Sequence, residues 1–183
     1  WSAANQANAI WAARTVALFA IGWAGAFRRS ELVSLTWESV TWLESGIEIF
    51  LKSSKVDPSA SGFTKYIPYA HGDRCPVKAL KHWQDVCGCT TGFIFKAVGQ
   101  SGRISVKPLT AHGVAQIVKR IIKKIGRDPD VFSAHSLRAG FVTAGTLALV
   151  PDFLLMQVTG HKSHATLQKY VRIGKRRQIP SLL

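Results

Sequence analysis

Residues 133–170, SAHSLRAGFVTAGTLALVPDFLLMQVTGHKSHATLQKY, contain helix-start signals and a turn that bring several polar side chains together. Ser133 or Ser136 can cap a helix of small and apolar residues. In that helix His135 lies at the N-terminus and Arg138 lies one turn further on, so the two side chains are expected to share a face. A polar pair therefore occupies the N-terminal end of an otherwise apolar helix.

The remainder of this stretch predicts a second helix, a sharp turn and a third helix. Pro151 suits the start of a helix at 152–159, and Gly160 suits the position just past its end. His161 then follows directly after the turn, and Tyr170 lies nine residues later on the last helix. We expect His161 to lie close to the N-terminus of the first helix.

These residue types favour chemistry on a phosphate. Helix N-termini and an arginine attract phosphate oxygens, and histidines exchange protons near neutral pH. A tyrosine hydroxyl becomes a nucleophile when the attacked centre is electrostatically activated. The reaction that fits this set of residues is therefore attack on a phosphodiester.

The composition indicates a globular and strongly basic protein. The 183 residues are enough for one domain, and 47% hydrophobic residues are enough for a core. Twenty-four Lys and Arg against ten Asp and Glu give a formal charge of +14, which favours a polyanionic partner. Nucleic acid is the first expectation and an anionic membrane surface the second. No apolar run reaches the roughly 18 residues that a membrane span needs.

Hydrophobic periodicity predicts a mostly helical α+β fold with one small antiparallel sheet. Helical spacing in FRRSELVSLTWESV directs Leu32 and Leu35 into the core. Residues 40–70 alternate instead, which predicts three short antiparallel strands with Lys55 opening the second loop. A loop lysine usually serves solubility, although beside an anionic site it could protonate a leaving oxygen. Further helices are expected at about 5–26, 76–86 and 109–125, and a short strand at 92–95.

The cysteines and histidines leave metal-binding alternatives open. Cys75, Cys87 and Cys89 lack the paired spacing of a disulfide framework, so reduced thiols are the simplest interpretation. With His82 they could form a zinc site, although C-x-C with one distant cysteine is poor ligand spacing. A metal-dependent phosphoesterase is a further alternative, although no carboxylate lies at ligand spacing. Its ligands would be His112, His135, His161 and His164.

Five short motifs follow one another along nearly the whole chain. They are R-x-x-E-L at Arg28 to Leu32, a hairpin lysine at Lys55, H-x-L-R at His135 to Arg138, G-H at Gly160 to His161, and a tyrosine at Tyr170. Each motif alone is weak, but their order and the final spacing are specific. This arrangement resembles the catalytic domain of the tyrosine recombinase, or phage integrase, family.

The resemblance implies a catalytic set of Arg28, Lys55, His135, Arg138, His161 and Tyr170. In this family the two arginines clamp the scissile phosphate, and the tyrosine attacks phosphorus to form a 3′-phosphotyrosine link. The lysine protonates the departing 5′ oxygen, while His135 assists proton transfer and His161 hydrogen-bonds the phosphate. Glu31 is expected to support Arg28 rather than to react. A register error of one residue would exchange Arg28 for Arg29.

The resemblance also implies a site-specific DNA recombinase or integrase that needs no metal or cofactor, because the covalent link conserves the phosphodiester energy. Residues 1–183 would be the catalytic domain, without the N-terminal core-binding domain of the family. Since the chain begins at Trp1, we expect a fragment. Double-stranded DNA is the expected partner, with a homotetramer on DNA, or a monomer alone, acting in the cytoplasm away from membranes. A catalytically inactive DNA-binding remnant and a type IB topoisomerase-like activity are the alternatives.

Overall fold

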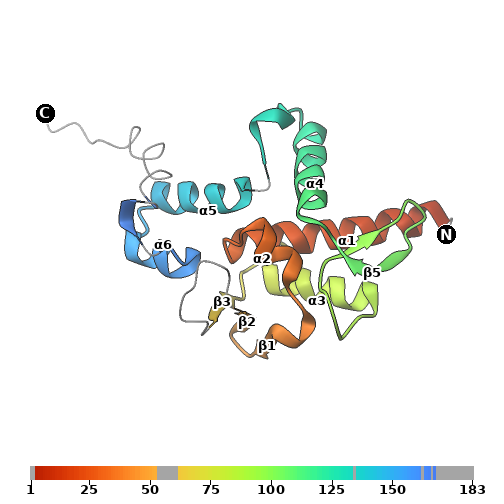
Figure 1. Ribbon diagram of the computed structural model, residues 1–183, viewed down its shortest axis with the longest axis horizontal. Helices are drawn as coiled ribbons and strands as arrows, with labels where there is room; N and C mark the ends of the chain where they lie inside the picture. The colour runs from red at the N-terminus through yellow and green to blue at the C-terminus, as the bar shows by residue number, and fades with distance from the viewer. Residues whose placement is uncertain (1–2, 53–61, 134, 162, 166, 168–183) are drawn as a thin grey trace, which may run out of the picture.

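The computed structural model describes residues 3–52, 62–133, 135–161, 163–165 and 167. Within these residues the fold is mostly helical, with two small antiparallel sheets (Figure 1). The helices are α1 (Ala3–Ala24), α2 (Arg29–Ser34), α3 (Pro76–Cys87), α4 (Ala111–Lys124), α5 (Ser136–Leu147) and α6 (Asp152–Thr159), with short 3-10 helices at Trp37–Ser39 and Pro129–Val131. The strands are β1 (Val40–Leu43), β2 (Gly46–Leu51), β3 (Phe63–Pro68), β4 (Lys96–Val98) and β5 (Ile104–Pro108). None of the described helices is both long and apolar enough to cross a bilayer.

The three-stranded sheet forms where the alternating pattern predicted it. Its strands are ordered β1-β2-β3, and both pairs are antiparallel. Ile47, Ile49 and Ile67 are fully buried on its inner face, while the intervening Glu48 and Tyr66 are exposed. The predicted fold class, α+β with a small three-stranded antiparallel sheet, is confirmed.

The smaller sheet of β4 and β5 was not predicted. The segment expected to be a strand, 92–95, forms one isolated bridge between Thr36 and Phe93. The backbone N–H of Ile94 donates to the carbonyl of Leu35 at 2.9 Å. Regular strand pairing begins only after this segment, whose backbone bonds to Leu35 and Trp37 after the end of α2 and, through the carbonyl of Phe95, to Leu109 after the end of β5.

Helix α1 runs through the middle of the molecule, with α3 and the larger sheet on one side and α4 and α5 on the other (Figure 1). Two glycines allow α5 to approach it closely. A Cβ at Gly22 would lie 2.9 Å from Leu137 Cδ1, and a Cβ at Gly140 would lie 2.5 Å from Trp23 Cζ3. This approach brings Arg138, the neighbour of Leu137, against the C-terminal end of α1.

Helix α5 differs from the prediction in detail, whereas α6 has the predicted bounds. Helix α5 ends at Leu147, its N-cap is His135, and neither serine caps it with a side-chain hydrogen bond. Instead Ser133 Oγ accepts from the backbone N–H of His135, and Ser136 Oγ accepts from that of Ser133. Helix α6 ends as predicted, at Gly160, whose φ of +68° is a left-handed conformation that glycine adopts without strain.

Candidate functional site

Arg28 is held at the start of α2 by Glu31. The guanidinium Nη1 lies 2.5 Å from Glu31 Oε1, and the Arg28 backbone N–H donates to Oε2 at 2.8 Å. The same carboxylate therefore fixes both the backbone and the side chain of Arg28. Arg29, one residue later, is exposed. The prediction that Glu31 supports Arg28 agrees with this geometry.

Arg138 joins α5 to the turn that precedes Arg28. Its side chain is only 3% exposed, and Nη1 donates to the carbonyl of Ala26 at 2.9 Å. Ala26 has a φ of +46°, which is unfavourable for a residue with a Cβ, so this turn depends on the surrounding contacts. The position of Arg28 is therefore linked to that of Arg138 through the turn.

His161 follows the Gly160 turn and is almost buried. Thr159 Oγ1 lies 2.8 Å from His161 Nδ1 and donates its single hydrogen to the carbonyl of Leu155 at 2.6 Å. When this hydrogen goes to Leu155, Nδ1 is the donor in the histidine contact and Nε2 carries the lone pair in the neutral ring. Burial, followed by the positive charges of Arg138, Arg28 and Lys65, lowers the pKa of His161 to about 4.

We expect His161 to stay neutral at pH 6. Because the pKa in the folded protein (about 4) lies below the ordinary 6.5, the unfolded chain binds more protons between these values. The stability that the neutral ring contributes is therefore complete above pH 6.5 and lost as the pH falls to about 4. NMR titration of ¹⁵N-labelled histidine measures this directly. Half-protonation of His161 near pH 6.5 would contradict the expectation.

The same NMR measurement tests the contact with Thr159. Thr159→Val removes the Oγ1 acceptor, so the neutral His161 ring should shift from the Nδ1–H tautomer toward the Nε2–H tautomer.

Lys65 is a residue of this site that sequence reasoning missed. It lies on β3 and is 4% exposed, and its Nζ donates to the carbonyls of Gly25 at 2.6 Å and Val158 at 2.5 Å. Burial lowers its pKa to about 7; the charge of Glu31 opposes this shift, and those of Arg138 and Arg28 add to it. The available signal was the strand alternation, because Lys65 shares its face with the buried Ile67.

Arg28, Lys65, Arg138 and His161 form one group of interacting basic side chains, which we call the basic cluster. The charges of the other three members all lower the pKa of His161. The structure thus brings together three of the residues singled out in the sequence, Arg28, Arg138 and His161, and adds Lys65.

The remaining candidate residues are placed differently. His135 is exposed at the N-cap of α5, whereas Arg138 is buried against the end of α1. The close approach of α5 to α1 buries Arg138 and leaves His135 exposed, and the expectation that the two side chains share a face stays a prediction. Lys55 and Tyr170 lie outside the described residues.

The metal-site alternatives gain no geometric support. Within the residues that the structure describes, no three His, Cys, Asp or Glu side chains gather in a way that could hold a metal ion. Cys75 is buried and its Sγ accepts from the backbone N–H of Ala70 at 3.3 Å, while Cys89 lies 3.3 Å from Lys96 Nζ. The cysteines and histidines proposed as ligands are therefore not assembled into a site.

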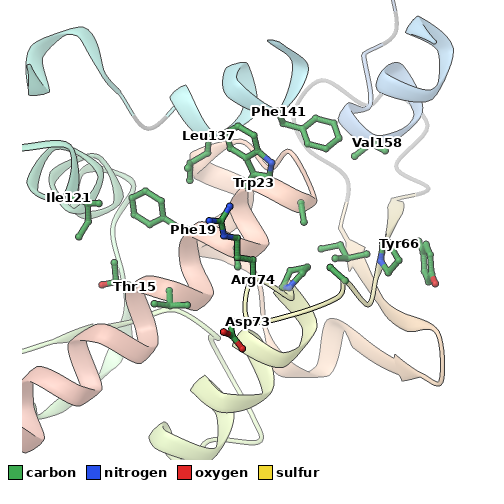
Figure 2. Close-up of a pocket in the computed structure, with 17 residues that line it drawn as sticks. Thr15, Phe19, Trp23, Tyr66, Asp73, Arg74, Ile121, Leu137, Phe141 and Val158 are labelled. Carbon is green, nitrogen blue, oxygen red and sulfur yellow. The ribbon is translucent and has the colours of Figure 1, made fainter. Parts of the chain in front are cut away.

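An apolar groove of about 890 Å³ is lined by residues of α1, α5, α6 and β3 (Figure 2). Trp23 of α1, Leu137 and Phe141 of α5, and Val158 of α6 contribute to its wall, with Tyr66 of β3 at the edge of the view. None of the four described candidate residues lines it. Leu137 and Val158 connect the two regions, since one precedes Arg138 and the carbonyl of the other binds Lys65.

Comparison of the fold with solved structures identifies similar architectures. The crystal structure of the XerH site-specific recombinase in a post-cleavage complex with a palindromic difH substrate matches with a TM-score of 0.72 and 21% identity, covering 96% of this chain and 48% of that one. A lambda integrase dimer bound to a COC′ core site matches with a TM-score of 0.60 and 18% identity, covering 92% of this chain and 57% of that one. At these identities the likeness concerns the fold.

Comparison of the sequence is more specific. An integrase/recombinase xerD homolog from Selenomonas ruminantium is 37% identical over 162 residues, which cover 88% of this chain and 48% of the relative. The chain thus spans about half the length of that relative. The model of the phage integrase family matches residues 2–177. A match over nearly the whole chain, together with the recombinase fold, means that this protein belongs to the phage integrase family.

Proposed function

We propose that this chain is the catalytic part of a site-specific DNA recombinase that cleaves and rejoins strands through a covalent 3′-phosphotyrosine link. The observation that carries the proposal is the convergence of Arg28, from the start of α2, and Arg138, from the first turn of α5, on one turn beside His161. Two arginines from separate elements are suited to bind the two non-bridging oxygens of a phosphodiester. The formal charge of +14 suits a DNA partner.

In this proposal each residue has one step. Tyr170 attacks phosphorus, the bond to the 5′ oxygen breaks, and Lys55 gives that oxygen a proton. Arg28 and Arg138 neutralise the charge that develops on the phosphoryl oxygens. His135 assists in removing the phenolic proton. The reverse attack by a 5′ hydroxyl reseals a strand and regenerates the phenol, so the number of phosphodiester bonds is conserved.

His161 needs a proton to donate a hydrogen bond through Nε2, because its Nδ1–H already binds Thr159. A phosphate between the arginines supplies negative charge that offsets the positive charges now lowering the pKa of His161. Binding of the scissile phosphate should therefore favour the protonated, donating form. His161 would then donate a hydrogen bond through Nε2 only while the phosphate is bound.

The proposed partner is double-stranded DNA, and the proposed assembly is a homotetramer that holds two duplexes. The solved relatives support the first part, since XerH is described with a difH substrate and lambda integrase as a dimer on a core site. Size measurement of the complex by light scattering, with and without DNA, tests the second part.

A suicide-substrate assay tests the proposed reaction. The chain within its full-length protein is incubated in EDTA with nicked duplex from the ends of its own element, and adducts that resist denaturation are collected. An adduct in EDTA is expected. Binding without an adduct would overturn the proposal in favour of an inactive remnant. Relaxation of supercoils without strand exchange would overturn it in favour of a topoisomerase-like activity.

A further inference from the structure

The buried ammonium of Lys65 has an unusual set of partners. An ammonium loses its hydration on burial, so it must be compensated by the protein. Its two hydrogen-bond partners are the carbonyls of Gly25 and Val158, at 2.6 and 2.5 Å. The rings of Phe27 and Phe63 lie 5.0 and 5.6 Å away. Glu31 acts on it only through its charge.

The two carbonyls belong to helix C-terminal ends. Gly25 directly follows α1, and Val158 lies in the last turn of α6. Carbonyls at these positions have no partner within their own helix, and the negative end of the helix dipole attracts a cation. Lys65 of β3 therefore joins two helix ends that are far apart in sequence, separated from it by 40 and 93 residues.

Each of these helix ends leads directly to a candidate phosphate ligand. Gly25 begins the turn that reaches Arg28 three residues later, and the next carbonyl, of Ala26, binds Arg138. Val158 precedes His161 by three residues, across the Gly160 turn. The distance between the arginine side of the basic cluster and its histidine side is thus set through Lys65.

We propose that Lys65 is a positioning residue, which fixes the turn carrying Arg28 relative to the end of α6 carrying His161 and does not touch the DNA. The inference rests on the proposed function for the roles of those two residues. Among the residues that the structure describes, two carbonyls take ammonium hydrogens of Lys65, and the rings of Phe27 and Phe63 lie 5.0 and 5.6 Å from Nζ. Lys65 therefore has little capacity left to donate to substrate.

Charge separates this role from simple structural support. Lys65 adds a positive charge near Arg28 and Arg138. The charges of these two arginines disfavour the protonated form of the buried amine. Replacing Lys65 by methionine removes a desolvated cation but leaves the carbonyls of Gly25 and Val158 without this donor, so a modest loss of stability is expected. A lysine that serves stability alone would change the unfolding temperature without a selective loss of cleavage, whereas a positioning lysine loses cleavage far beyond its loss of stability.

The experiment compares Lys65→Met with Ile49→Met. Ile49 is the cross-strand partner of Lys65 on the same buried face, so its replacement perturbs the packing without removing the ammonium. Three quantities are measured on the full-length protein: the unfolding temperature, the rate of adduct formation, and hydrogen exchange of the backbone amides at 22–31 and 154–161. If Lys65→Met does not fold, Lys65→Gln, which keeps an NH₂ group able to donate but carries no charge, replaces it.

We expect Lys65→Met to show a modest fall in unfolding temperature, to lose about 10- to 100-fold in cleavage rate, and to exchange about tenfold faster at both segments. Ile49→Met should change neither rate by more than about threefold. Unchanged exchange would overturn the positioning role, whether or not cleavage falls. If the unmodified protein makes the adduct and Lys65→Met cleaves at the same rate, the positioning role is also overturned. If the unmodified protein makes no adduct, the proposed function fails, and exchange alone decides whether Lys65 holds the two segments.

Discussion

Tyr170→Phe is expected to reduce the covalent DNA adduct to background, a loss on the order of 10⁴-fold or more. The phenolic oxygen is the atom that would bond to phosphorus, and phenylalanine has no atom that could replace it. DNA binding should stay within about threefold, because the substitution removes one hydroxyl and no charge. Denaturing electrophoresis with labelled suicide substrate measures the first quantity, and a mobility-shift titration measures the second.

The chain offers matched controls for this variant. It contains three tyrosines, and the other two, Tyr66 and Tyr69, are both exposed. Tyr66→Phe and Tyr69→Phe should therefore leave the adduct unchanged. The Tyr66 hydroxyl donates to the carbonyl of Ser45 at 2.9 Å, so its loss affects a surface contact only. If the adduct persists in Tyr170→Phe but disappears in one of the controls, the nucleophile is the tyrosine replaced in that control and not Tyr170.

Arg28→Lys is expected to lower the rate of adduct formation by about 10²- to 10³-fold, with little change in DNA affinity. Lysine keeps the charge but lacks the planar fork that binds two oxygens of a phosphate at once. The ion pair with Glu31 is half exposed on the arginine side, so folding stability should change by no more than about 1 kcal/mol. Single-turnover kinetics and urea unfolding measure the two effects.

Arg29→Lys is the matched control, because Arg29 is adjacent in sequence and exposed. Its replacement should leave the rate within about twofold. The pair of variants also tests the alignment of the R-x-x-E-L motif. A large loss in Arg29→Lys combined with a normal rate in Arg28→Lys would mean that the register is wrong by one residue.

Much of the architecture could be predicted because it depends on local patterns. The spacing of Leu32 and Leu35 placed them in the core, where both are 1% exposed. Alternation between 40 and 70 predicted the three-stranded sheet, and Gly160 predicted the turn before His161. Each of these features is set by side-chain periodicity or by the backbone freedom of one residue.

The misses all depend on contacts between distant segments. The burial of Arg138 was not predicted, because it arises where Gly22 and Gly140 let α5 approach α1. The second sheet was missed because its strands have only three and five residues, which is too short for an alternating pattern, and are defined by their pairing with each other. Neither effect leaves a periodic signal in its own stretch.

The primary sequence carries the order of the elements, the family motifs and the basic charge of this protein, since these reside in single residues and short spacings. It does not carry the arrangement around Lys65. Strand alternation puts Lys65 on the buried face of β3, but only the folded chain brings the carbonyls of Gly25 and Val158, at the ends of α1 and α6, to its ammonium. Burial and partners of a charged group are properties of the folded chain, because both are supplied by segments remote in sequence.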